Sequence, residues 1–251
     1  MNIIGTIQAR LGSERLPGKV LKEIRGKPML LWQVERLRRS RLLDEVVVAT
    51  TVNPNDDLIV KLCEKNGIKY FRGSEDDVLD RVASAIRHFN IDVHAEFFGD
   101  SPLTDPHLID EVLGFYLKNR DLYDCVTNAL KTTYPPGQEV TVYAGKALVE
   151  AEKAVPKGDP LRAHVSIHLT QHRDKYRICN LEAPAHYHYP DIYLEVDEPN
   201  DFRLISSVIE HFSGQGRDHF SLAQILDYLL ANPDLIKINQ RIERRWKAFK
   251  E

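Results

Sequence analysis

The sequence predicts an α/β protein built on a mostly parallel sheet with helices on both faces. Three observations lead to this prediction. Short apolar runs such as residues 3–8 alternate with longer segments in which apolar residues recur at helical spacing. Each strand-to-helix unit has the length of a crossover between parallel strands. With 251 residues, 43 % of them hydrophobic and 28 % charged, the chain is long enough for one large α/β domain.

The first half of the chain shows the clearest alternation. The run Val46-Val47-Val48 is typical of a buried strand, and Gly67 is typical of a helix end. Proline suits the first turn of the helices expected at 28–40 and 106–119. Strands are expected at residues 3–8, 45–50 and 95–98, with a shorter one that reaches Arg72. Two more helices are expected, one from Asn55 or Asp56 to residue 66 and one at 76–89.

After about residue 123 the pattern changes. Strands are expected at 124–128, 139–143, 176–181 and 192–196, and helices at 145–154, 160–172, 199–212 and 222–230. The last segment, 237–250, predicts an amphipathic helix because its apolar residues have helical spacing: Ile238, Ile242, Trp246 and Phe249. We expect one domain over residues 1–251, divided into 1–122, 123–215 and a C-terminal helical extension at 216–251.

Composition narrows the classes of partner and compartment. A formal charge of −3 gives no reason to expect nucleic acid as a partner. No run of about 18 apolar residues is present, so we expect no membrane span. The first residues already read as a strand and carry no leader pattern, which predicts a cytoplasmic protein. Cys63, Cys125 and Cys179 are far apart and show no zinc spacing, so core thiols in a reducing compartment are expected.

The loop after the first expected strand carries the strongest chemical signal. It holds Arg10, Arg15 and Lys19 together with Gly12 and Gly18. Glycines let a backbone approach phosphate oxygens, and the three side chains supply positive charge, so the loop suits a triphosphate. Its spacing matches neither G-x-x-x-x-G-K-[ST] nor G-x-G-x-x-G. This argues against a P-loop nucleotide hydrolase and against a dinucleotide-dependent dehydrogenase.

Two aspartates follow expected strands directly. Asp100 comes just after the strand at 95–98, and Asp197 comes just after the one at 192–196. In open α/β sheets, ligands bind beyond the carboxyl ends of the strands. Carboxylates there could hold the Mg2+ that accompanies a triphosphate. Either residue could instead be a turn or helix-capping aspartate.

The loop at 9–19, which reads A-R-x-G-S-x-R-L-P-G-K, resembles the signature of the sugar-acid cytidylyltransferases. The branch in question contains spore-coat polysaccharide biosynthesis protein F and 3-deoxy-manno-octulosonate cytidylyltransferase. The resemblance continues through residues 26–30, 47–51, 71–81, 99–103 and 196–202. It implies a Rossmann-like nucleotidyltransferase sheet, with a nucleotide half first and a smaller acceptor-side β/α insertion after it. It also implies CTP and Mg2+, with a small acidic sugar-like acceptor.

The resemblance assigns roles to individual residues. It implies that Arg10, Lys19 and Asp100 are catalytic and that Asp100 and Asp197 hold the metal. Nucleotide contacts would come from the first loop and from the segment after the strand that reaches Arg72, which lines the cytosine pocket in this family: Ala9, Arg10, Gly12, Ser13, Arg15, Lys19, Arg72, Gly73, Ser74, Asp77 and Arg81. Glu139, Arg162 and His164 would contact the acceptor. We identify no side-chain general base.

Several alternatives stay open at this point. Around Arg162 and His164 the chain reads L-R-A-H-V-S, where the family often has E-R-E-H-V-T. Because of these departures the acceptor could also be a phosphorylated polyol or a phosphonate. A nucleotide-sugar glycosyltransferase is a second possibility, although Asp100-Ser101-Pro102 lacks the D-x-D pair of that class. A catalytically silent nucleotide-binding protein is a third. A homodimer is possible.

Overall fold

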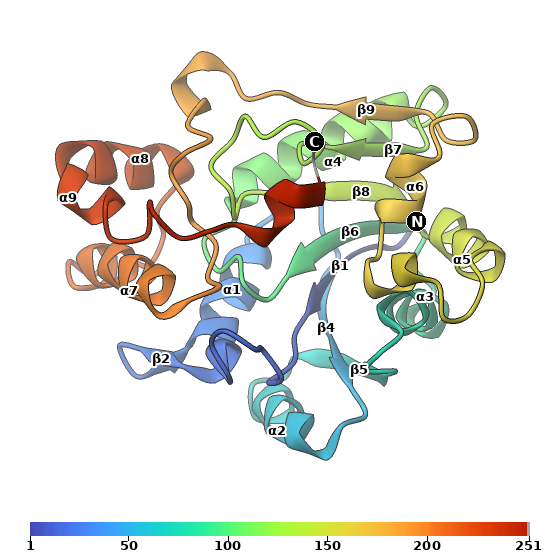
Figure 1. Ribbon diagram of the computed structural model, residues 1–251, viewed down its shortest axis with the longest axis horizontal. Helices are drawn as coiled ribbons and strands as arrows, with labels where there is room; N and C mark the ends of the chain where they lie inside the picture. The colour runs from blue at the N-terminus through green and yellow to red at the C-terminus, as the bar shows by residue number, and fades with distance from the viewer. Residues whose placement is uncertain (250–251) are drawn as a thin grey trace.

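The computed structural model describes residues 1–249 and centres on a seven-stranded sheet of order β5-β4-β1-β6-β8-β7-β9 (Figure 1). Strands β1 (Ile3–Gln8), β4 (Glu45–Thr51), β5 (Lys69–Gly73) and β6 (Val93–Phe98) pair in parallel. β8 (Thr141–Ala144) runs antiparallel between β6 and β7 (Cys125–Thr127), and β9 (Ile178–Asn180) pairs in parallel with β7. The predicted mostly parallel sheet is confirmed.

Helices cover both faces of this sheet. Ile7 and Val48 point into the core formed with α1 (Met29–Leu37), α2 (Asp57–Lys65), α4 (Pro106–Asn119), α7 (Pro199–Ser213) and α8 (Leu222–Ala231). Ile4 and Val47 point to the opposite core, formed with α3 (Val78–Phe89) and α5 (Gly145–Ala154). Side chains alternate between the two faces along a strand, so adjacent apolar residues serve different cores. Helices on both faces are therefore confirmed.

The remaining elements are short. The hairpin of β2 (Glu23–Ile24) and β3 (Lys27–Pro28) precedes α1. Short helices lie in the connections: η1 (Lys19–Leu21), η2 (Pro54–Asp56), η3 (Pro160–Ala163), α6 (Ile167–Gln171), η4 (Ala185–Tyr187), α9 (Pro233–Ile236) and η5 (Arg245–Phe249). Within residues 1–249, no helix is long and apolar enough to cross a membrane.

Two expected elements in the second half are wrong. The helix expected at 160–172 is split into η3 and α6 because His164, between them, has extended backbone at φ −122° and ψ 151°. The segment 192–196 is no strand of the sheet. Leu194 N donates to Pro136 O at 2.7 Å and Val196 N donates to Asp100 O at 2.8 Å. The segment thus bridges two loops, and those isolated bonds replace a strand ladder.

The expected tail helix at 237–250 is also wrong over the residues described. The chain forms the short α9 and η5, and Lys250 lies outside the described residues. The physical reason lies in two polar side chains of this segment, Asn239 and Arg244, which are almost completely buried. Their hydrogen bonds to the body of the protein determine the path of the chain more strongly than the apolar spacing does.

Gly137 allows the bridging segment to pass close to the loop before β8. Its φ is 97°, and a Cβ atom there would lie 2.5 Å from the carbonyl carbon of Leu194 and 2.7 Å from Glu195 N. Those are backbone atoms, so they cannot rotate away as a side chain could. A larger residue would therefore displace the segment that carries Asp197.

We predict that Gly137→Ala costs about 2 kcal/mol or more of unfolding free energy, because left-handed strain and a backbone clash add. Gly158→Ala is the matched control, because its φ of 88° is similar and a Cβ atom there would have nothing within 4 Å. Urea unfolding of both variants measures the difference. Equal destabilisation would mean that the close approach at Gly137 contributes nothing.

Candidate functional site

The loop between β1 and α1 is held in shape by its own backbone and by one buried carboxylate. Gly18 has a φ of 69° and precedes η1, whose first residue is Lys19. Asp56, which the sequence analysis considered only as a helix cap, accepts from Leu11 N at 2.7 Å and from the Thr51 hydroxyl. These contacts tie the loop to the end of β4. The loop is therefore preorganised before any ligand arrives.

The side-chain nitrogen of Lys19 lies close to the carboxylates of both Asp100 and Asp197. Its Nζ lies 3.6 Å from Asp100 Oδ2 and 3.2 Å from Asp197 Oδ1, and it donates to Val196 O at 2.7 Å. Arg15 adds a second cation, 2.7 Å from Asp197 Oδ2 and 3.6 Å from Glu198 Oε1. Arg15 thus pairs with both Asp197 and Glu198. Asp100 and Asp197, which lie 97 positions apart in the sequence, therefore contact the same lysine.

The two carboxylates fit a divalent cation that is shared with phosphate. The oxygens of Asp100 and Asp197 already converge on one positive group, the Lys19 ammonium. Among residues 1–249, no three His, Cys, Asp or Glu side chains gather as a metal-binding group. Mg2+ is commonly held by one or two carboxylates together with substrate phosphates and water, so two suffice.

The buried carboxylate of Asp201 forms hydrogen bonds with both the Asp197 backbone and the C-terminal segment. It lies at the third position of α7 and closes a capping box with Glu198, and its Oδ2 accepts from Asp197 N at 3.0 Å. Its carboxylate also receives both terminal nitrogens of Arg244, at 2.8 and 3.1 Å. Both side chains are buried, 0 % and 1 % exposed. Asp201 thus lies in the first turn of α7 and also anchors the C-terminal segment.

The predicted nucleobase segment is brought beside the first loop. A Cβ atom on Gly12 would lie 3.6 Å from Glu75 Oε1, which places the two loops next to each other. Burial, and then the nearby charge of Arg10, lowers the pKa of Arg81 to about 10. Arg10 is exposed and makes no hydrogen bond or ion pair with the described chain. An exposed cation thus lies near the space between the loops.

Three residues assigned to the nucleotide are occupied by contacts within the protein. Arg72 donates to Thr51 O and Asn53 O and pairs with Asp57 at 2.7 Å. Arg81 donates to Ser74 O at 2.5 Å. Asp77 caps α3 by accepting from Asp80 N. The Arg72, Arg81 and Asp77 side chains therefore hold the segment at 72–81 in shape through contacts within the protein.

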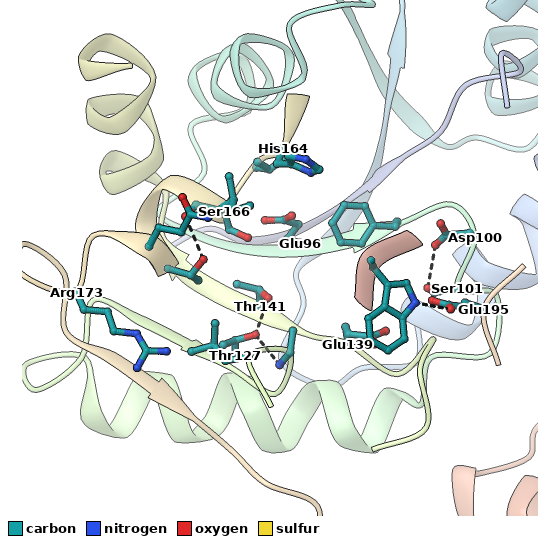
Figure 2. A pocket seen from close by; sticks show the side chains of 18 residues that line it. Glu96, Asp100, Ser101, Thr127, Glu139, Thr141, His164, Ser166, Arg173 and Glu195 are labelled. Atoms are coloured by element: carbon teal, nitrogen blue, oxygen red, sulfur yellow. Dashed lines mark hydrogen bonds between the residues drawn. The ribbon is translucent and has the colours of Figure 1, made fainter. Parts of the chain in front are cut away.

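A cavity of about 500 Å3 opens beside Asp100 (Figure 2). Its floor is the sheet at β6, β8 and β7, and its far wall comes from the segment 164–173. Figure 2 shows Asp100, Glu139 and Glu195 at one end of the cavity and Arg173 at the other. Arg173 is exposed and forms no hydrogen bond or ion pair within residues 1–249. The cavity thus carries opposite charges at its two ends.

Two of the three residues expected at the acceptor line this cavity. His164 and Glu139 do so, and Glu139 also accepts from Gly137 N at 2.8 Å. Arg162 does not. Its guanidinium is buried between Asp77, at 2.7 Å, and Glu152, at 2.8 Å. That placement corrects the expectation that Arg162 touches an acceptor, because its donors are used to join α3 to α5.

The lining residues that the sequence analysis did not assign include Glu96, Arg173, Glu195 and Trp246. A signal for two of them was available, since Glu96 and Glu195 are carboxylates inside otherwise apolar runs, where an unpaired charge would be costly. Arg173 and Trp246 had no such signal, because exposed arginines and amphipathic tails are common. Trp246 Nε1 donates to Glu195 Oε1 at 2.7 Å.

Burial perturbs two of these carboxyl groups. It raises the pKa of Glu96 to about 7, against the opposing effect of hydrogen bonds from Ser166 and Tyr143. Burial, and then the charge of nearby Glu139, raises the pKa of Glu195 to about 8. Perturbed groups in a cleft are typical of functional sites. The cavity thus holds carboxyl groups that can donate as well as accept hydrogen bonds near neutral pH.

Comparison with known proteins agrees with this geometry. A family model described as cytidylyltransferase matches residues 4–216. The chain is 36 % identical to an uncharacterized protein of Methanocaldococcus jannaschii, over 100 % of this chain and 99 % of that protein. It is 32 % identical to the spore coat polysaccharide biosynthesis protein SpsF of Bacillus subtilis, over 93 % and 96 %.

Solved structures show the same fold. A cytidylyltransferase of Leptospira borgpetersenii superposes with a TM-score of 0.89 at 27 % identity, covering 97 % of this chain and all of that one. A CMP:2-keto-3-deoxy-manno-octonic acid synthetase complexed with CTP superposes with a TM-score of 0.62 at 19 % identity, covering 84 % and 99 %. The second likeness concerns the fold alone.

We predict that Glu96 makes stability fall as pH rises. Its folded pKa, about 7, lies above the ordinary value of 4.5, so its contribution is complete below pH 4.5 and is lost as pH rises toward 7. Glu96→Gln stays neutral, so the stability of wild type relative to this variant should drop by a few kcal/mol between pH 5 and 8. Urea unfolding across this range measures it. A pH-independent difference between the two proteins would rule out the effect.

Proposed function

Because the chain belongs to the cytidylyltransferase family, a class of CTP-dependent nucleotidyltransferases, we propose that it transfers CMP to a sugar acid. The acceptor would be of the 2-keto-3-deoxy type, pyrophosphate would be released, and the product would serve surface polysaccharide or glycan synthesis. One observation carries this proposal. Asp100 and Asp197 meet at Lys19, where the basic loop and the cavity adjoin.

The nucleotide would lie along the basic loop. Attack on the α-phosphorus places additional charge on its oxygens and on the departing pyrophosphate, and fixed cations lower that barrier. Lys19 is held by Asp197 and Val196 O, so its position is fixed before binding. Arg10 is exposed and can turn toward the phosphates. The cytosine would then lie between this loop and residues 73–77.

Asp100 and Asp197 would hold Mg2+ together with phosphate oxygens. Mg2+, when bound there, would offset phosphate charge and lower the pKa of the acceptor hydroxyl. In this chain the two carboxylates are positioned by different means. Asp100 follows β6 directly, whereas Asp197 depends on Arg15, Lys19 and Asp201.

The acceptor would occupy the cavity beside Asp100. Arg173, at the end opposite Asp100, would donate hydrogen bonds to hydroxyl groups at the far end of the acceptor. Glu139, Thr141 and His164 offer hydrogen-bond partners for hydroxyl groups along the length between. A polyhydroxylated molecule whose reacting end lies at Asp100 matches this order of groups. That two relatives are a 3-deoxy-manno-octulosonate cytidylyltransferase and SpsF supports the same acceptor class.

We predict a strong preference for CTP in the presence of Mg2+. Pyrophosphate release should be measured with each of the four nucleoside triphosphates against a panel of sugar acids that includes 3-deoxy-manno-octulosonate and N-acetylneuraminate. Ribitol 5-phosphate and 2-aminoethylphosphonate should be tested alongside. Turnover with CTP and only the last two compounds would replace the proposed acceptor class, and a preference for UTP or ATP would contradict the nucleotide assignment.

We predict that Asp100→Asn lowers kcat by about a hundredfold or more, because a metal-held contact in the transition state is lost. The fold should be retained, since the residue lies beyond the end of β6 and is one-third exposed. Asp234→Asn is the matched control, because that carboxylate is exposed and pairs only with Lys237. Near-normal turnover of Asp100→Asn would make the residue structural.

A further inference from the structure

We propose that the C-terminal strap, residues 239–247, determines acceptor specificity, with Trp246 as the surface against which a sugar ring packs. This inference rests on the proposed function, because it concerns the cavity assigned there to the acceptor. It adds a residue that the family pattern does not include, since the matching family model ends at residue 216. The strap therefore lies outside the residues that the family model matches.

The strap forms one wall of the cavity. Figure 1 shows the C-terminal segment, in red, crossing in front of the sheet near β8. Trp246 lines the same cavity as Thr141 of β8 and Asp100 beyond β6, which confirms that this crossing is a real approach. Residues more than 140 positions apart thus enclose one space. Without the strap, the end of the cavity near Asp100 would lose the indole that faces it.

Buried polar contacts fix the strap in place. Asn239 donates to Tyr193 O at 3.1 Å and to Asp201 Oδ1 at 2.8 Å. Arg244 makes the two-nitrogen contact with Asp201, and its guanidinium carbon lies 4.3 Å from the centre of the Tyr193 ring. Arg and carboxylate groups buried to this degree have to remain paired. The strap is thus a fixed wall and its indole has a defined position.

The indole is oriented by a carboxylate of the same cavity. Trp246 Nε1 donates to Glu195 Oε1 at 2.7 Å, and Arg244 lies 3.5 Å from the same oxygen. Lys247 Nζ lies 5.8 Å from the centre of the ring, and the indole lines the cavity. Aromatic faces carry negative charge and attract C–H groups with partial positive charge, such as those on a sugar ring. Glu139 and Glu195 can accept hydroxyl hydrogen bonds beside it.

This combination favours one acceptor shape over the alternatives. A pyranose sugar acid has a C–H face for the indole and hydroxyls for the glutamates and Arg173. A short phosphonate or an open-chain polyol phosphate has no ring to place against Trp246. The strap therefore selects cyclic, polyhydroxylated acceptors, and its contribution is to acceptor binding and not to CTP binding.

Steady-state kinetics of Trp246→Ala and Trp246→Phe test the proposal, with CTP and acceptor each varied in turn. We expect the KM of the best sugar acid to rise roughly tenfold in Trp246→Ala and less in Trp246→Phe, which keeps an aromatic face. The KM of CTP should stay within about twofold. Lys237→Ala is the matched control, since this exposed residue before the strap pairs only with Asp234. An unchanged acceptor KM, or an equal rise in both KM values, would overturn the proposal.

A second readout separates this proposal from the proposed function. In a Trp32→Phe background, Trp246 is the single tryptophan, because the chain has two. Its emission should change saturably when 3-deoxy-manno-octulosonate or N-acetylneuraminate is added without CTP. A saturable emission change without any turnover would support acceptor binding at Trp246 and contradict the proposed reaction. Turnover with unaltered Trp246→Ala kinetics would support the proposed reaction and contradict the role of Trp246. Unchanged emission together with absent turnover would contradict both proposals.

Discussion

The site depends on one buried carboxylate, that of Asp201. It receives the backbone N–H groups of Asp197 and Glu198, the side chain of Asn239 and both terminal nitrogens of Arg244. A buried charge has to be fully partnered, so these groups cannot separate without a large cost. One residue at the start of α7 therefore fixes the proposed metal carboxylate on one side and the C-terminal strap on the other.

This arrangement explains how a segment outside the sheet can carry a site residue. Residues 192–196 make no strand ladder and are held by Pro136 O, by Asp100 O and by the space that Gly137 leaves. Asp100 is rigid because β6 is central in the sheet, whereas Asp197 is positioned by tertiary contacts from three regions. The two carboxylates thus belong to different parts of the chain; Lys19 pairs with both, and Arg15 pairs with Asp197.

Local sequence patterns predicted the fold. A sheet buried on both faces requires apolar runs in its strands and apolar residues at helical spacing in the helices that cover it, and both are visible in the sequence. The position of Asp100 was predictable for a related reason, since it follows a strand of the sheet directly, whereas Asp197 was expected after a strand that does not form and reaches Lys19 through tertiary contacts. Arg162 was assigned wrongly because its partner Asp77 lies 85 positions away, and no local pattern records such a pair. The prediction of a tail helix was wrong for the same reason, because the buried contacts of Asn239 and Arg244 determine the path of the chain more strongly than the helical spacing of its apolar residues.

The division of labour in the molecule follows from these constraints. Strands β1, β4, β5 and β6 and their loops supply the proposed nucleotide side, where regular structure dictates residue positions. The cavity proposed for the acceptor is lined by segments that the sequence patterns did not predict, namely the break at His164 and the strap at 239–247. Loops and termini can change without disturbing the two hydrophobic cores. A cytidylyltransferase built in this way can keep its reaction while the acceptor changes, because the walls that contact the acceptor are fastened to the core by a few buried polar groups.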